Sequence, residues 1–237
     1  MALLQTMKAA LGIMASGILD HDGTIADFQG DAALGFWGWP VDLEEGPILA
    51  CRAALRILEE FELANERNDK DLTGFSVGIG ISHGRALAGK IGTLKQSEVG
   101  VFGPVVNQGA RLEGMTKMFG VPICIDDETA KLVSQLSLPC RIRPLAQVCP
   151  KGMSTPVMVH GLTPIRSAHS ELDEQALSNH AAAVHAIIQG AWADAARLLS
   201  SLPDDDGPSR FLKRFLADRK NNEPDPDWDG CIHLQAK

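Results

Sequence analysis

The sequence predicts an α+β fold, a mixed β-sheet with helices packed on one face, followed by an all-helical extension. Two observations carry this prediction. Segments with apolar residues at helical spacing alternate with short runs of Val, Ile and Gly typical of strands. After a polar joint, "TPIRSAHSELDE", the chain becomes rich in alanine at helical spacing. The boundary therefore divides residues 1–163 from residues 164–237.

The expected elements follow the chain in a simple order. "HDGT" and "QGD" are turn signals, and Pro104 and Gly120 bracket a helix because proline suits a first helical turn and glycine a position just past the end. Helices are expected at residues 3–19, 43–65, 104–119, 126–136 and, in the extension, within 176–203 and 209–220. Strands are expected at residues 24–28, 32–39, within 75–92, and at 98–103, 121–125, 140–148 and 156–162.

One element is absent from this order. A βαββαβ unit normally opens with a strand in the middle of its sheet, but here the first element is the helix at residues 3–19.

Composition narrows the function classes. The 237 residues are 45% hydrophobic and 22% charged, as in globular proteins with a sizeable core. A net charge of −8 argues against a nucleic-acid partner, and no apolar run approaches a membrane-spanning length. The five cysteines are scattered without a CxxC pair, which predicts reduced thiols, no zinc site and a cytoplasmic protein.

Three stretches hold the candidate chemistry. In "DFQGDAALGFWGWP", Asp31 is either a turn residue or a metal ligand. In "VFGPVVNQGARLE", Asn107 and Arg111 are four residues apart and share one helix face among apolar neighbours. In "CPKGMSTPVMVHGL", Lys151 precedes a glycine. His180 and His185, on an Ala-rich helix, are expected at the surface.

Together these stretches resemble the class III adenylate and guanylate cyclase catalytic domain, of bacterial type. The matching segments are "GTIADFQGDAALGFWG", "FSVGIGISHGRALAGKIG", "VFGPVVNQGARLEG" and "KGMSTPVMVHGL", in the order of the family. The resemblance implies a ferredoxin-like, palm-like βαββαβ sheet. It also implies conversion of a nucleoside triphosphate to a 3′,5′-cyclic nucleotide and pyrophosphate, in signal transduction.

The resemblance assigns roles residue by residue. Asp31 matches a metal aspartate that helps to hold two Mg²⁺ or Mn²⁺ ions. Asn107 matches the residue that orients the ribose, and Arg111 matches the arginine that stabilises the transition state at phosphorus. Lys151 matches the triphosphate lysine, and Lys95 falls near a further phosphate contact. In this family each site is split across a head-to-tail homodimer.

The positions that read the base are Asp27 and Gly100. An acidic residue suits the N–H donors of guanine, whereas Gly100 offers no side chain. The rest of the sequence is similar to bacterial adenylate members, so ATP is favoured over GTP.

The sequence departs from the family at its start. The first metal aspartate belongs in a "DIxGFT"-like strand before the first helix, and neither Asp20 nor Asp22 replaces it in register. Three explanations are open: a fragment of a longer protein with an upstream sensor or regulatory domain, a miscalled start, or decay. The alternative function is an inactive pseudo-cyclase that dimerises or binds nucleotide. A relative that condenses two GTP molecules would need GG[DE]EF, which "QGDAA" does not supply.

Overall fold

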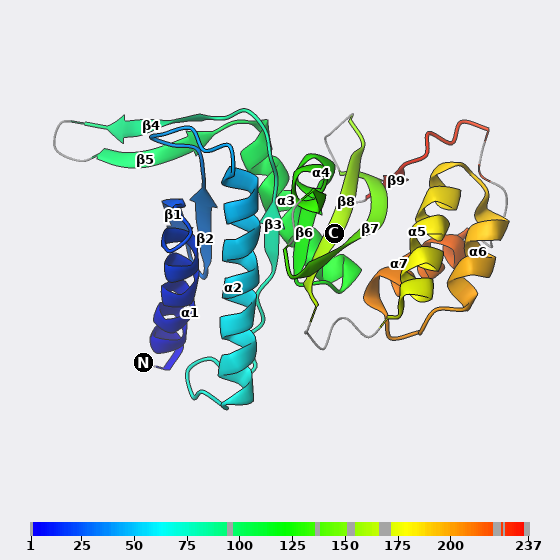
Figure 1. Cartoon of the computed structure of the whole chain (residues 1–237), viewed down its shortest axis with the longest axis horizontal. Helices are drawn as coiled ribbons and strands as arrows, with labels where there is room; N and C mark the ends of the chain where they lie inside the picture. The colour runs from blue at the N-terminus through cyan, green and yellow to red at the C-terminus, as the bar shows by residue number, and fades with distance from the viewer. Residues whose placement is uncertain are drawn as a thin grey trace.

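A computed structural model describes residues 2–93, 97–135, 138–150, 155–165, 172–219, 224 and 226–234 (Figure 1). The helices within this part are α1 (Ala2–Leu19), α2 (Gly46–Glu66), α3 (Pro104–Phe119), α4 (Asp127–Ser134), α5 (Glu174–Ile188), α6 (Trp192–Ser200) and α7 (Gly207–Asp218). The strands are β1 (Thr24–Gln29), β2 (Ala32–Phe36), β3 (Ile79–Ile81), β4 (Leu87–Gly92), β5 (Ser97–Phe102), β6 (Ile123–Asp126), β7 (Cys140–Cys149), β8 (Val157–Pro164) and β9 (Ile232–His233). None of the described helices is long and apolar enough to cross a membrane.

The main sheet has five strands in the order β3-β6-β8-β7-β9. The β3–β6 and β7–β9 pairs are parallel, and β8 runs antiparallel to both β6 and β7. Two separate antiparallel hairpins, β1–β2 and β4–β5, complete the strands. The predicted α+β class is therefore confirmed.

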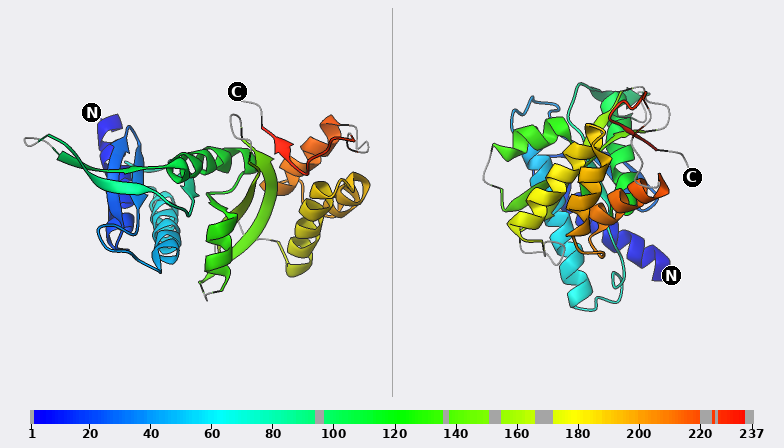
Figure 2. Two further views of the ribbon diagram at one scale, coloured as in Figure 1. Left: turned by 90° about the horizontal axis from the view of Figure 1, so that it is seen from above. Right: turned by 90° about the vertical axis from the view of Figure 1, so that its right-hand side faces the viewer.

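Helices cover both faces of the main sheet, so the prediction of helices on one face is wrong in this respect. Ile123 and Ile125 of β6 belong to a core shared with α2 and α4, whereas Cys124 between them belongs to a core shared with α3 and α5–α7. This alternation follows from the two-residue period of a strand. The second face is thus covered by α3 together with the extension, as the two views of Figure 2 also show.

Helix α2 joins the β1–β2 hairpin to the main sheet. One side of α2 packs into the core that it shares with α4 and the main sheet, through Cys51, Ala54 and Leu58. Ile57 and Phe61 pack with α1 and the hairpin in a separate core. Among the described residues no strand lies between β2 and β3, and each ends its own sheet (Figure 1).

The C-terminal extension docks on the sheet through an apolar core. Trp192 and Leu199 are buried there with residues of α3, β7 and β8. The Arg143 guanidinium of β7 also donates two hydrogen bonds, both of 2.7 Å, to the carboxylate of Asp206 at the N-terminus of α7. The extension is held by both an apolar core and a largely buried ion pair.

The tail strand β9 was not expected from the sequence. It pairs with the end of β7, Val148 opposite Ile232 and Cys149 opposite His233. The Trp228 indole N–H donates to the carbonyls of Ile187 and Ile188, which fixes the tail against α5.

The predicted surface position of His180 is wrong. His180 is fully buried, with neither ring nitrogen hydrogen-bonded to a described residue, whereas His185 is exposed. Burial, and secondarily the nearby Arg143, lowers the pKa of His180 to about 3, and Asp206 opposes this only in part. The ring is therefore neutral in the folded protein.

This burial makes folding sensitive to acid. The unfolded chain binds a proton at His180 near pH 6.5 and the folded chain does not, so stability falls as pH drops below 6.5. We expect His180→Leu to remove up to about 1.4 kcal/mol per pH unit from the slope of unfolding free energy against pH below 6. Urea unfolding at pH 7.5, 6.0 and 5.0 measures it. His185→Leu, on the same helix, should leave the slope unchanged, and equal slopes for both variants would contradict the assignment.

Candidate active site

Asp31 lies at the tip of the β1–β2 hairpin. The register pairs Gln29 with Ala32, so Gly30 and Asp31 form the two-residue turn, and Gly30 adopts a φ of +67° that favours glycine. Asp31 is exposed and has no hydrogen bond or ion pair to any residue that the structure describes. Its carboxylate is thus free to bind a ligand, although its setting is also that of an ordinary turn.

Helix α3 positions Asn107 and Arg111 on its first two turns. Asn107 is exposed and Arg111 half-buried, and within the described ranges neither side chain has a hydrogen bond or an ion pair. An arginine that is partly removed from water without a carboxylate partner is available for an anionic ligand.

The start of α3 is fixed by polar contacts that the sequence interpretation missed. The Ser82 hydroxyl donates to the Val105 carbonyl at 2.7 Å. The buried Asp126 carboxylate accepts hydrogen bonds from the Gln108 amide (2.9 Å) and the His83 backbone N–H (3.0 Å), and it caps α4 by accepting from Thr129 N–H (2.9 Å). The "DDET" stretch predicts the cap, but no local signal predicts the contacts to α3.

Helix α3 also lies unusually close to β3. A Cβ at Gly80 would lie 2.2 Å from both the Glu113 nitrogen and the Gly109 oxygen. Because both are backbone atoms, only glycine allows this approach of helix and strand. Gly80 therefore helps to set the height of Asn107 and Arg111 above the sheet.

The two positions that are predicted to read the base lie on elements that pack against each other. Asp27 is exposed on β1 and accepts a hydrogen bond from the Gln29 side chain at 3.3 Å. Gly100 lies on β5, and the β4–β5 hairpin passes across β1 (Figure 1). A Cβ at Gly100 would meet the side chains of Phe102 and Ile91, so those two side chains fold over the glycine.

The remaining predicted residues, Lys95 and Lys151, lie outside the described residues. Lys151 follows the end of β7 at Cys149 by two positions.

The predicted residues separate into two groups. Asp31 and Asp27 belong to the β1–β2 hairpin, which packs with α1 and α2. Asn107 and Arg111 lie on α3, which packs on the face of the main sheet opposite to α2. Within the described part of the chain, Asp31 belongs to no cluster of three potential metal ligands. Asp31 alone does not fit a two-metal site, which needs several oxygen ligands.

Buried thiols near these elements are unreactive. Burial is the main cause that raises the pKa of both Cys51 and Cys124 to about 12. Because the thiolate is the nucleophile, neither residue is a candidate for covalent catalysis.

The comparisons with known proteins identify the family of this chain. The profile of the "Adenylate and Guanylate cyclase catalytic domain" family matches residues 27–160, more than half of the chain. The chain therefore belongs to the adenylate and guanylate cyclase catalytic-domain family.

Two of the curated relatives are named as adenylate cyclases. "Adenylate cyclase 1" of Rhizobium meliloti (strain 1021) is 33% identical over 141 residues, covering 59% of this chain and 21% of that protein. An "Adenylate cyclase" of Anabaena cylindrica is 29% identical over 134 residues, covering 54% and 25%. The chain thus spans about a fifth to a quarter of the length of these curated relatives.

Solved structures share the fold. The guanylyl cyclase Cya2 superposes with a TM-score of 0.60 at 26% identity, covering 68% of this chain and 80% of that one. The adenylyl cyclase CyaB from P. aeruginosa gives a TM-score of 0.56 at 23% identity, covering 70% and 84%.

The close contact at Gly80 yields a test of how α3 is positioned. Gly80→Ala should force α3 away from β3 and lower stability by about 1–3 kcal/mol, measured by urea unfolding. Gly114→Ala lies on the same helix with no atom within 4 Å of the added Cβ, so it should be neutral or stabilising by up to about 1 kcal/mol. Equal stability of both variants would refute the seating of α3 on Gly80.

Proposed function

We propose that this domain converts ATP to 3′,5′-cyclic AMP and pyrophosphate, in signal transduction within the cytoplasm. The observation that carries the proposal is the pair Asn107 and Arg111. Both lie on the first turns of a helix whose start is fixed by Ser82 and Asp126, and neither is committed to a described protein partner. Family membership supplies the reaction class.

In the proposed reaction the ribose 3′-oxygen attacks the α-phosphorus. A bond forms between that oxygen and phosphorus, the bond to the pyrophosphate oxygen breaks, and the 3′-hydroxyl proton is released. Arg111 offers a fixed positive charge to the phosphoryl oxygens, whose charge grows in the transition state. Asn107 orients the ribose, which holds the attacking oxygen near phosphorus. Lys151 and Lys95 are proposed to bind the triphosphate.

The predicted Mg²⁺ or Mn²⁺ pair needs a ligand besides Asp31. When bound, such ions neutralise charge on the attacking and leaving oxygens. The strand edges of β2 and β3 support a specific source, because a strand inserted between them would lie beside the β1–β2 hairpin. We infer that a carboxylate on such a strand completes the site in the active protein. Without it, the pseudo-cyclase alternative applies.

We also infer a homodimer in which Asp31 of one protomer meets Asn107 and Arg111 of its partner. The separation of these residues over two cores supports this arrangement. The β4–β5 hairpin supports it further, because one face carries three exposed apolar side chains. Leu87, Ile91 and Phe102 are 79%, 50% and 56% exposed, and the register puts them on one face.

The residues near the expected base position bear on whether the substrate is ATP or GTP. The exposed Asp27 carboxylate on β1 favours guanine, because it accepts hydrogen bonds and guanine offers two N–H donors. Gly100 adds no donor or acceptor from its side chain, and the named curated relatives are adenylate cyclases. ATP is therefore the proposed substrate and GTP the competitor in every assay.

Replacing Arg111 tests the proposed chemistry. The variant is made in this chain if it shows cyclase activity, and otherwise in a chain extended upstream. In that active protein we expect Arg111→Gln to lower kcat by about 10²–10³-fold. The assay is mass-spectrometric detection of cyclic nucleotide with Mn²⁺ and either ATP or GTP. Lys117→Gln, an exposed cation on the same helix, is the matched control and should keep kcat. Near-normal turnover of Arg111→Gln would reject the mechanism. No product from folded protein, with or without the upstream extension, would favour the pseudo-cyclase.

The hairpin surface can be tested separately. Ile91→Asp places a charge on the apolar face and should shift the chain from dimer to monomer in sedimentation velocity, with loss of any cyclase activity. Lys90→Asp lies next to it on the opposite face and should leave the dimer intact. A wild-type chain that is monomeric at all concentrations would contradict the proposed dimer.

A further inference from the structure

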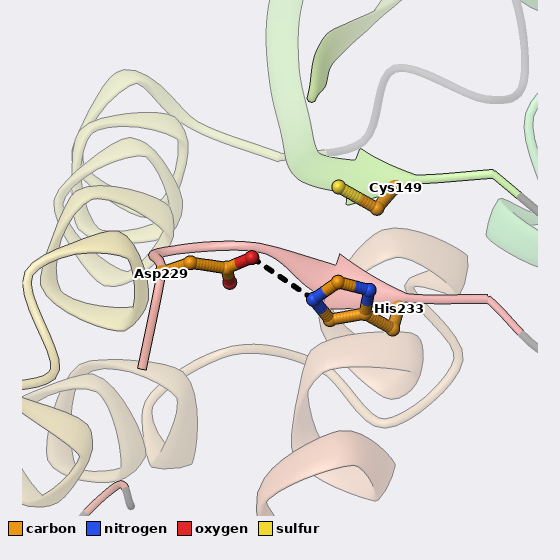
Figure 3. A group of neighbouring side chains, drawn as sticks. All are labelled: Cys149, Asp229 and His233. Atoms are coloured by element: carbon orange, nitrogen blue, oxygen red, sulfur yellow. Dashed lines mark hydrogen bonds and ion pairs between the residues drawn. The ribbon is translucent and has the colours of Figure 1, made fainter. Parts of the chain in front are cut away.

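The tail strand β9 brings a thiol, an imidazole and a carboxylate together at the end of β7. Cys149, Asp229 and His233 each offer one potential ligand atom, and these atoms all lie within 4.8 Å of one another (Figure 3). The parallel pairing of Cys149 with His233 creates this cluster from positions more than eighty residues apart. Sequence spacing therefore could not reveal it.

A second thiol, Cys231, lies outside this three-residue group but contacts it through Cys149. Cys231 is fully buried, and its Sγ lies 2.7 Å from Sγ of Cys149 as a free thiol pair. The Cys231 backbone N–H donates to Oδ1 of Asp229 at 3.0 Å, and Nε2 of His233 lies 3.0 Å from Oδ2 of the same carboxylate. The thiols are buried while Asp229 and His233 are exposed, so the cluster has an apolar floor and a side open to solvent.

We propose that Cys149, Cys231, Asp229 and His233 form a binding site for a Zn²⁺-class transition metal. Two sulfur ligands with one imidazole and one carboxylate give the four-coordinate, N- and S-rich set that Zn²⁺ prefers, whereas Mg²⁺ and Ca²⁺ require oxygen ligands. Two thiolates bound tetrahedrally at about 2.3 Å lie about 3.8 Å apart. Metal binding would therefore separate the two sulfurs by about 1 Å.

The site differs in kind from the proposed catalytic metal site. The catalytic ions would be held by carboxylates near Asp31, on the β1–β2 hairpin, whereas this cluster lies at the opposite edge of the main sheet, where β9 docks (Figure 1). Occupied, it would cross-link the tail to the sheet, which is the usual effect of a structural zinc.

Cobalt spectroscopy distinguishes the two kinds of site. The full-length, tag-free chain is reduced, freed of metal under nitrogen and titrated with Co²⁺ alone. We expect one Co²⁺ per chain with tetrahedral visible bands and a thiolate-to-cobalt charge-transfer band, both displaced by Zn²⁺. An oxygen-ligated catalytic site gives neither signal, so loss of cyclase activity and loss of this site are separable.

Matched variants assign the ligands. Cys149→Ser, Cys231→Ser and His233→Asn should each weaken Co²⁺ binding at least tenfold and abolish the rise in Tm on adding Zn²⁺. His233 is exposed, so His233→Asn tests the site without disturbing the core. Cys140→Ser and His185→Asn are the controls and should bind as the wild type does. A wild type without the thiolate band, unchanged binding in His233→Asn, or a Cys149–Cys231 disulfide in place of metal binding would each overturn the proposal.

Discussion

The arrangement of the whole domain depends on the two-sided packing of α2. Among the described residues, no strand hydrogen-bonds the β1–β2 hairpin to the main sheet, so helix packing must place one relative to the other. Cys51, Ala54 and Leu58 are fixed to the sheet, and Ile57 and Phe61 are fixed to α1 and the hairpin. The small residues let α2 approach both partners closely. The position of Asp31 relative to every residue on the sheet is thus set by apolar side chains and not by strand pairing.

Helix α3 is held by a different kind of contact. Its apolar residues enter the core shared with the extension, but its height and its start are set by Gly80 and by the carboxylate of Asp126. The Asp126 carboxylate accepts hydrogen bonds from His83, two residues after the end of β3, from Gln108 of α3 and from Thr129 in the first turn of α4. A buried carboxylate that accepts three hydrogen bonds holds the three donor groups in fixed positions relative to one another. These contacts fix the turns of α3 that carry Asn107 and Arg111.

Local patterns in the sequence were sufficient where local physics decides the structure. Pro104 and Gly120 mark the ends of α3 because ring geometry and a left-handed φ act within a few residues. Local patterns in the sequence were insufficient where the interacting residues lie far apart in the chain. His180 is predicted at the surface as a histidine on an Ala-rich helix, but α5 packs that side against the distant strands β7 and β8 and helix α3. The β9 pairing, and with it the contact of Cys149 with Cys231, joins positions whose sequence spacing carries no signal. The roles of Asp31, Asn107 and Arg111 came from motif order and stay predictions.

Strand β7 contacts the C-terminal extension at two points along its length. Arg143 of β7 pairs with Asp206 of α7, and the far end of β7 pairs with β9 at Val148 and Cys149. β7 therefore contacts the extension at both its middle and its end. Lys151, the proposed triphosphate lysine, follows that end by two residues. The thiol, imidazole and carboxylate cluster therefore lies where the tail strand joins the end of β7, two residues before the position of Lys151 in the sequence.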